Sequence, residues 1–426
     1  MRAALMLVAA LAACGDGIGA PDATLPTDTP GGLVRVRVTG PDAQAVRVIF
    51  QNADSSLVLS TRTDLEGRAN AFMVPGGFVT LAVPDGFQQR LYTWSDVQPG
   101  DDLVLGEAFT LPGPLSPSFR VTVPEDPGQE HYALSTTCGA EALDAPQVLT
   151  TQVFFSGCAE QHDVLITNSD PSFQNEHYLF LDGVTLAGAV LSLETPFRAF
   201  DSARVEVRNV PDHLQDLGVS MMLFDNGFPM QSSLRGRSFS LSGGGGALDL
   251  PMMLPAGATV MMSMQSSIFG PAVTGIPHVI RWGPPQSVTS VDLATTALRP
   301  YVEQPLYVRA AHALRWAEWS TGAQADAVIA AWGWSDFSRG GNYQWHVFAP
   351  RTEDTLVKLP VLPYPDLMPG PNAQLQHPYE LTNIKADGGY AKLRTRLPIT
   401  WTAGRNWPID SPSGEVVMQQ LGGQFD

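Results

Sequence analysis

The sequence has few cysteines, few charged residues and only one long apolar run. Three of the 426 residues are cysteine, and charged residues make up 16% of the chain. The apolar run, from Ala3 to Ala13, has eleven residues, whereas a transmembrane helix needs roughly 20. No other stretch approaches that length, so we expect no transmembrane helix.

Basic residues are scarce relative to acidic ones. The chain holds 25 Lys and Arg against 42 Asp and Glu, which gives a formal net charge of −17. A surface of this sign repels phosphate backbones and anionic lipid headgroups, so nucleic acid is not expected as a partner. The solubility of an exported protein would explain the acidity, and so would a bridging cation or a basic partner.

Local catalytic motifs are also missing. The sequence has no His-Glu-x-x-His, no phosphate-binding loop, no dinucleotide fingerprint and no Gly-x-Ser-x-Gly. The eight histidines are dispersed. We therefore predict no cofactor and favour a non-catalytic protein. A Ser-His-Asp triad is defined in space rather than in sequence, so a hydrolase with a dispersed triad stays open as an alternative.

Glycine and proline, in contrast, are frequent. The chain has 40 Gly and 35 Pro spread along its length, and 44% of its residues are hydrophobic. This composition is typical of a folded protein with many turns between short strands. The length predicts two to four domains.

The amino terminus combines one positive charge, Arg2, with the apolar run and a cysteine, Cys14. This order is that of a secretory signal. The segment Leu11-Ala12-Ala13-Cys14 resembles the bacterial lipobox. The resemblance implies that residues 1–13 are a signal peptide and that a lipid on Cys14 attaches the protein to a membrane of the cell envelope. An ordinary signal peptide with a chance cysteine is the alternative.

The residues that follow Cys14 bear on its destination. Gly15 comes next and Asp16 one position later. In enteric lipoproteins an Asp directly after the cysteine retains the protein at the inner membrane, so the resemblance favours the outer membrane. Residues 14–32 are rich in Gly, Asp, Pro and Thr and read as the lipidated cysteine and a flexible tether.

The other two cysteines, Cys138 and Cys158, form an even pair in an exported chain. Such a pair predicts a disulfide, since the compartment outside the cytoplasm is oxidising. A zinc site would need further ligands, and neither flank supplies Cys or His at zinc spacing. We therefore predict a disulfide between Cys138 and Cys158 and no metal.

Apolar residues alternate with polar ones in many short runs. Val34, Val36 and Val38 open the first run, and similar runs follow between Gly, Pro and Asp turns. This period of two predicts an all-β fold made of serial antiparallel β-sandwich domains behind the tether. The predicted blocks are a β-sandwich at 33–113, a disulfide-stapled β-sandwich at 114–192, a Met-rich β domain at 193–300 and a Trp-rich β domain at 301–426.

The first block contains two recognisable segments. Thr63-Asp64-Leu65-Glu66-Gly67-Arg68-Ala69 and Val74-Pro75-Gly76-Gly77-Phe78-Val79-Thr80-Leu81 resemble the carboxypeptidase regulatory-like (transthyretin-like) domain. In that family the first segment is a tight turn, and a Tyr usually stands where Phe78 is here. The resemblance covers about residues 33–110 and implies a sandwich fold without chemistry. The remainder loosely resembles uncharacterised envelope lipoproteins, a likeness that carries no activity.

Methionines concentrate in the third block. They could form an adaptable binding face or a soft-metal site, but no His or Cys accompanies them, so we favour core filling. The eight residues are Met221, Met222, Met230, Met252, Met253, Met261, Met262 and Met264.

Closely spaced oxygen ligands raise the question of calcium. Asp64 with Glu66, and Asn168-Ser169-Asp170, place such ligands together. Neither group follows the twelve-residue loop spacing of a calcium site. We therefore favour turn formation for both.

The last block holds seven of the nine tryptophans. Trp332, Trp334 and Trp345 could form an exposed platform that stacks on sugar rings, or they could fill a sandwich core, which we favour. The segment Ala323–Ala331 fits either a short helix or a buried strand.

These patterns favour a non-catalytic cell-envelope lipoprotein with a structural or interaction role. Its partners would be the membrane, through the lipid on Cys14, and an envelope protein or a glycan. A glycan-binding lipoprotein that uses the Trp-rich domain is the first alternative, and an envelope hydrolase is the second.

Overall fold

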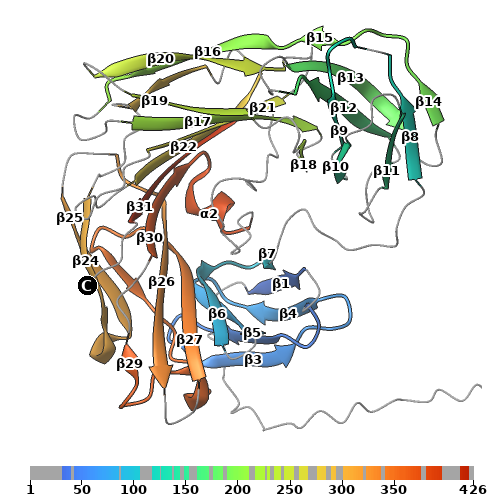
Figure 1. Ribbon diagram of the computed structural model, residues 1–426. Coiled ribbons are helices and arrows are strands. Elements are labelled where there is room, and N and C mark those ends of the chain that lie inside the picture. Colours follow the sequence, from blue (N-terminus) through green and yellow to red (C-terminus); the bar gives the residue numbers. More distant parts are fainter. Residues whose placement is uncertain are drawn as a thin grey trace, which may run out of the picture.

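The computed structural model is built almost entirely of β-strands in several sheets, which confirms the predicted all-β sandwich class (Figure 1). No helix among the described residues is long and apolar enough to cross a membrane. The structure describes residues 31–39, 43–85, 88–105, 118–124, 126–136, 139–143, 148–152, 161–171, 176–185, 190–210, 216–225, 228–230, 235–240, 244–253, 259–266, 276–284, 289–293, 301–319, 323–336, 341–375, 380–395 and 413–421.

The first unit is a two-layer sandwich of seven strands. One layer has the order β4-β1-β7 and the other β3-β2-β5-β6. In the first layer β1 pairs antiparallel with β4 and parallel with β7. The strands are β1 (Gly32–Val38), β2 (Arg47–Gln51), β3 (Leu57–Arg62), β4 (Arg68–Met73), β5 (Gly77–Asp85), β6 (Gln88–Val97) and β7 (Asp102–Leu105). The alternation predicted at Val34, Val36 and Val38 is confirmed, since all three side chains are buried in the sandwich.

The same seven-strand order occurs twice more. The second unit has layers β11-β8-β14 and β10-β9-β12-β13, and the third has β20-β16-β23 and β19-β17-β21-β22. In both, the first strand again pairs antiparallel with the fourth and parallel with the last. The first three units are therefore structural repeats of one topology.

The strands of the second unit are β8 (Ser118–Thr122), β9 (His131–Thr136), β10 (Gly139–Leu143), β11 (Val148–Gln152), β12 (Gln161–Ser169), β13 (Glu176–Thr185) and β14 (Val190–Ser192). Those of the third unit are β16 (Asp201–Arg208), β17 (Asp216–Asp225), β19 (Arg235–Ser240), β20 (Gly245–Met252), β21 (Thr259–Ser266), β22 (Ile276–Gly283) and β23 (Ser290–Asp292). Two short strands add to these units: β15 (Arg198–Ala199) pairs with β13, and β18 (Phe228–Pro229) pairs with β17.

The fourth unit has a different topology. A small sheet of order β24-β25-β28 faces strands of order β31-β30-β26-β27. Its elements are β24 (Tyr301–Val308), β25 (Ala313–Trp319), β26 (Ala327–Asp336), β27 (Gly341–Pro350), β28 (Leu356–Lys358), β29 (Gln374–Leu375), β30 (Glu380–Ala386), the helix α2 (Gly389–Leu393) and β31 (Gly414–Leu421). The ambiguous segment at Ala323–Ala331 thus enters a strand, β26.

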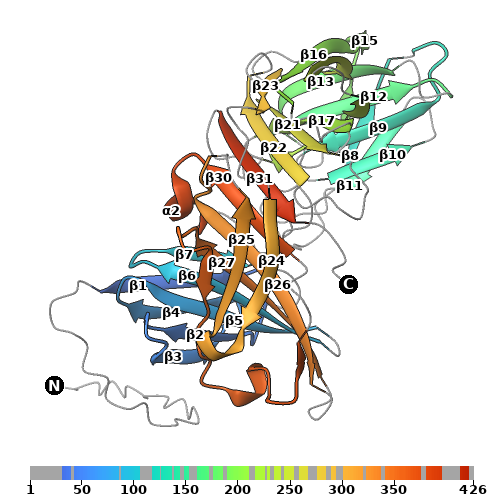
Figure 2. The ribbon, with the colours of Figure 1, turned by 90° about the vertical axis from the view of Figure 1, so that its left-hand side faces the viewer.

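One large sheet joins three of the four units. The fourth unit's β27 pairs in parallel with β6 of the first unit, and its β31 pairs antiparallel with β22 of the third. The result is a fourteen-stranded sheet, while the second unit keeps its own two sheets (Figure 2). The units within 33–113, 193–300 and 301–426 are therefore joined by backbone hydrogen bonds.

The cores follow from this shared sheet. Along β26, Ile329 faces the core that continues into the first unit, whereas Val328 and Ala330 face the core beneath β24-β25-β28. A strand that is buried on both faces reads as a continuous apolar run. For this reason the apolar residues of β26 show neither the alternation of a half-buried strand nor a helical period.

The turn between β3 and β4 is closed by the side chains of Thr63 and Asp64. Asp64 Oδ1 accepts the backbone N–H groups of Glu66 (2.9 Å) and Arg68 (2.8 Å). Thr63 Oγ1 donates to the Ala43 carbonyl at 2.7 Å. Gly67 has φ +74, and a Cβ there would collide with the Val38 carbonyl oxygen.

We expect Gly67→Ala to lower the free energy of unfolding by about 1–3 kcal/mol, because it adds a steric collision to an unfavourable φ. Gly128→Ala is the matched control: its φ is +85 with nothing within 4 Å, so only the dihedral cost of about 1 kcal/mol is expected. Urea unfolding of both variants measures the difference. Equal losses would contradict the close approach at Gly67.

Candidate functional site

The three tryptophans considered as a sugar platform lie inside the fourth unit. Trp332 and Trp334 on β26, and Trp345 on β27, are each 0% exposed. Trp332 stacks on Trp345 with ring centroids 5.1 Å apart, and Trp334 stacks on Tyr343 at 4.9 Å. The favoured interpretation, core filling, is what the structure shows. The alternative of an exposed platform fails, because side chains of β25 and β28 pack in the same core as these rings.

This aromatic core also contacts the first unit. Trp345 Nε1 donates to Thr93 Oγ1 on β6 at 2.9 Å. Thr93 in turn lies 2.8 Å from Thr80 Oγ1 on β5. The indole N–H of Trp345 is thus bonded at the junction between the fourth unit and the first, and it does not face a ligand.

The methionine group is core, as favoured from the sequence. Six of the eight lie in the core of the third unit and two in the core shared with the first and fourth units. All eight side chains are buried. The interpretation as core filling is confirmed.

The oxygen-rich segments serve local structure. Asp64 closes the β3–β4 turn, as described above. Asn168 is buried and its Nδ2 donates to Asp126 Oδ2 at 2.9 Å, while His177 Nδ1 lies 2.7 Å from the same oxygen. Within the described ranges, no group of three His, Cys, Asp or Glu side chains is arranged to hold a metal.

The cysteines Cys14, Cys138 and Cys158 all lie outside the described residues. Lipidation of Cys14 and the disulfide between Cys138 and Cys158 therefore stay predictions.

One serine–histidine pair bears on the hydrolase alternative. Ser263 Oγ on β21 lies 2.6 Å from His278 Nε2 on β22. Burial lowers the pKa of His278 to about 4, so its ring is neutral at pH 7. The hydrogen bonds of the described residues bring no carboxylate to the other ring nitrogen, and a triad needs one to orient the imidazole. A serine and a histidine without the carboxylate of a triad do not support a hydrolase.

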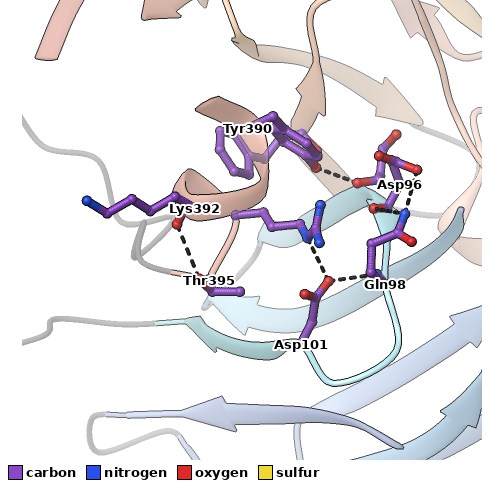
Figure 3. A network of polar contacts seen from close by, with 9 residues as sticks. Asp96, Gln98, Asp101, Tyr390, Lys392 and Thr395 are labelled. Carbon is purple, nitrogen blue, oxygen red and sulfur yellow. Dashed lines mark hydrogen bonds and ion pairs between the residues drawn. The ribbon is translucent and has the colours of Figure 1, made fainter. Parts of the chain in front are cut away.

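A network of polar contacts joins the first unit to the fourth (Figure 3). We call it the Arg394 network. It consists of Asp96, Gln98 and Asp101 from β6 and the β6–β7 turn, and of Tyr390 and Arg394 from α2 and the residue after it. The first three belong to the first unit and the last two to the fourth.

An ion pair is at the centre of the network. Arg394 Nε donates to Asp101 Oδ2 at 2.7 Å, and the two side chains are only 9% and 7% exposed. The same carboxylate oxygen accepts the backbone N–H of Gln98 at 2.7 Å. Gln98 Nε2 donates to Asp96 Oδ1 at 2.9 Å, so the contacts continue from Arg394 to Asp96.

Tyr390 adds a second link between the units. Its hydroxyl oxygen lies at hydrogen-bond distance from the carbonyl oxygens of Phe348 on β27 (3.1 Å) and of Ser95 on β6, and its single hydrogen is shared between these two acceptors. One phenol thereby bonds both strands of the parallel β6–β27 ladder. Burial raises the pKa of Tyr390 well above its ordinary value, so the hydroxyl stays a donor throughout the physiological range.

The two carboxylates of the network are not equivalent. Burial raises the pKa of Asp96, Arg394 opposes this shift, and the negative charge of Asp101 adds to it. Asp96 also has φ +53, a left-handed conformation that Asp and Asn tolerate better than most residues. The network therefore holds one paired carboxylate and one whose charge is disfavoured.

Sequence reasoning singled out none of the five residues. Arg394 and Asp101 are separated by 293 positions, and isolated Asp, Tyr and Arg residues carry no local pattern. Two glycines, Gly388 and Gly389, start α2 with φ of +85 and +60. They are the one local signal that the chain turns sharply here.

We expect Arg394→Met to lower the free energy of unfolding by about 3–5 kcal/mol, because it leaves Asp101 buried without a counter-charge. The double variant Arg394→Met/Asp101→Asn removes both charges and keeps an acceptor for Gln98, so it should recover a large part of the loss. Urea unfolding measures both. A double variant no more stable than the single one would show that charge pairing is not the cause.

Asp96 provides a pH test with a defined sign. Its raised pKa means that its stabilising contribution is complete below the ordinary value of 3.8 and is lost as pH rises through the raised folded value. Asp96→Asn, which keeps the Oδ1 acceptor, should therefore gain stability relative to the parent chain as pH rises from 4 to 7 (thermal midpoints). Asp54 has a lowered pKa through its bonds to Ser56, so its contribution is present above the ordinary value of 3.8 and is lost at lower pH. Asp54→Asn should therefore lose stability relative to the parent chain as pH rises from below the lowered value up to 3.8. The same sign for both would contradict the assignment.

Comparisons with known proteins add little. No protein-family model and no curated protein matches the chain. Among solved structures, the Bacillus anthracis TIE protein is 10% identical over 56% of this chain and 46% of its own, with a TM-score of 0.14. The Streptococcal ancillary pilin is 9% identical over 62% of this chain and 98% of its own, with a TM-score of 0.17. The chain thus spans less than half of the TIE protein, and likeness this low carries no argument.

Proposed function

We propose that this chain is a non-catalytic lipoprotein of the bacterial cell envelope with a structural or interaction role. The proposal is supported by the positions of the aromatic and charged side chains that could otherwise serve a binding or catalytic site. The tryptophans fill a core, and the Arg394–Asp101 pair and Tyr390 tie the first unit to the fourth. Side chains that an enzyme would present to a substrate here hold strands together.

The proposed anchor is a lipid on Cys14. Leu11-Ala12-Ala13-Cys14 supports it by resemblance to the lipobox, and the apolar run before it supports export. Gly15 at the next position favours the outer membrane. The tether from Cys14 would end where β1 begins, at Gly32.

The proposed modules are sandwiches of the carboxypeptidase regulatory-like kind. The first unit supports this through the Thr63–Gly67 motif and its Asp64-closed turn. The second would be stapled by the disulfide between Cys138 and Cys158. The proposed partners are an envelope protein or a glycan, and a glycan would have to be bound by residues other than Trp332, Trp334 and Trp345.

The anchor gives a direct test. In a bacterial host that lipidates the parent chain, Cys14→Ser removes the thiol that receives the lipid, so the protein should move from the membrane pellet to the soluble envelope fraction after cell fractionation. Cys138→Ser is the matched control, because it changes another cysteine and should leave the protein in the pellet. Retention of the Cys14→Ser protein in the membrane would refute the anchor.

A further inference from the structure

We propose that the shared sheet has two acid-sensitive joints: protonation of His346 and His278 loosens the β6–β27 and β22–β31 ladders before the sandwiches themselves unfold. At these ladders, the first and the second joint, the fourth unit meets the first unit and the third (Figure 2). Each ladder contains one of the two histidines. Histidine is the side chain that changes its charge most readily near neutral pH, and the inference does not depend on the proposed lipid anchor.

His346 lies inside the first joint. It is opposite Tyr92 of β6 in the parallel register, and the two rings stack with centroids 5.1 Å apart and planes at 19°. Tyr92 belongs to the core that continues from the first unit into the third and fourth. The imidazole therefore packs on a core ring across the joint, and a charge on it would lie between two units.

His278 has the equivalent place in the second joint. It is opposite Met418 of β31 in the antiparallel register, and its Nε2 lies 2.6 Å from Ser263 Oγ on β21. Ile280, two positions further along β22, belongs to the same core that His346 packs on. Because alternate side chains of a strand share a face, the two histidines lie on the same side of the shared sheet.

Both rings are neutral at pH 7. Burial lowers the pKa of His278 and of His346 to about 4, and the positive charge of Arg90 on β6 contributes to the lowered pKa of His346. On β26, the strand at its other side, His346 is opposite Ala331, which carries no charge. Acid would thus add a positive charge at a buried position in each joint, where a charge is costly.

The other polar groups of the joints can be told apart from the histidines. His278 is opposite Gln265 of β21, which does not titrate. An ion pair between Arg281 and Glu415 spans the second joint, and it lies on the face of the sheet opposite to His278, because side chains alternate along β22. Asp96, next to the first joint, has a raised pKa, so acid favours the closed state there. A loosening in acid would therefore have the sign of the histidines and not that of Asp96.

The sign and size of the pH effect follow from these shifts. In a closed joint each histidine takes up a proton only near pH 4, whereas in an open joint it would do so near its ordinary value of 6.5. The contribution of the neutral ring is therefore complete above pH 6.5 and is lost as pH falls toward 4. Between pH 7 and pH 5 the ratio of open to closed joint should rise about 20-fold at each joint.

The test is hydrogen–deuterium exchange at pH 7 and pH 5, measured by mass spectrometry of peptides and corrected for the intrinsic pH dependence of exchange. It uses the chain from residue 14 onward with Cys14→Ser, so that no lipid is attached and no detergent is needed. We expect the protection of amides that bond across the two joints to fall about 20-fold, because opening exposes them to water. Peptides from β12 and β13 of the second unit, which belong to neither joint, should keep their protection.

Two variants assign the effect to the histidines. His346→Phe keeps a ring on Tyr92 but takes up no proton, so it should abolish the pH effect at the first joint and leave that at the second unchanged. His278→Gln keeps an amide near Ser263 Oγ and should do the reverse. Each variant is thus the matched control for the other, and His312→Gln, which changes a histidine outside both joints, should behave like the parent.

Unchanged protection between pH 7 and pH 5 would overturn the proposal, and so would a uniform loss that includes β12 and β13. A loss at the joints that survives both histidine variants would overturn it as well, since the Arg281–Glu415 pair is intact in both. A response at one joint alone would overturn the assignment of the other histidine. Thermal midpoints at pH 7 establish that each variant is folded, and His346→Gln, which also removes the titration, replaces His346→Phe if the latter is not.

Discussion

The parallel ladder between β6 and β27 is the contact on which the rest of the molecule depends. It pairs Gln88–Trp94 with Asn342–Phe348 residue by residue, so it closes what would otherwise be two open sheet edges. Side chains reinforce the same junction from both faces of the sheet: Trp345 bonds Thr93 on one face, and Tyr390 reaches the carbonyls of Ser95 and Phe348 on the other. The amino-terminal and carboxy-terminal units are therefore one body.

This constraint explains how each face of the first unit is used. Its larger layer is covered on the inside by β4-β1-β7 and on the outside by the fourth unit, whose core includes Ile49, Ala82 and Leu91 from β2, β5 and β6. Among the described residues, the outer surface of β1 and β4 stays exposed along both strands. Exposed Phe72 and Leu33 on that face are harder to explain as packing than as a contact surface.

Short sequence patterns predicted the features that depend on neighbouring residues. The alternation of β1, the turn at Asp64 and Gly67, and the burial of the methionines all follow from neighbouring residues. The ladder between β6 and β27 and the Arg394–Asp101 pair join residues some 250–300 positions apart, and no short pattern encodes such contacts. The threefold repeat was missed for another reason: it lies in strand order, while the corresponding strands β1, β8 and β16 share little beyond alternation.

The tryptophans show what a local pattern leaves undecided when a strand has two buried faces. A single sandwich core rarely needs so many indoles, and that excess made a binding platform reasonable. The large sheet, however, is packed on both sides around β26 and β27: Trp332, Trp334 and Trp345 fill one side, while Trp94 and Trp282 belong to the core on the other. The excess of aromatic volume is thus a consequence of sharing one sheet among three units, which places these tryptophans at the structural centre.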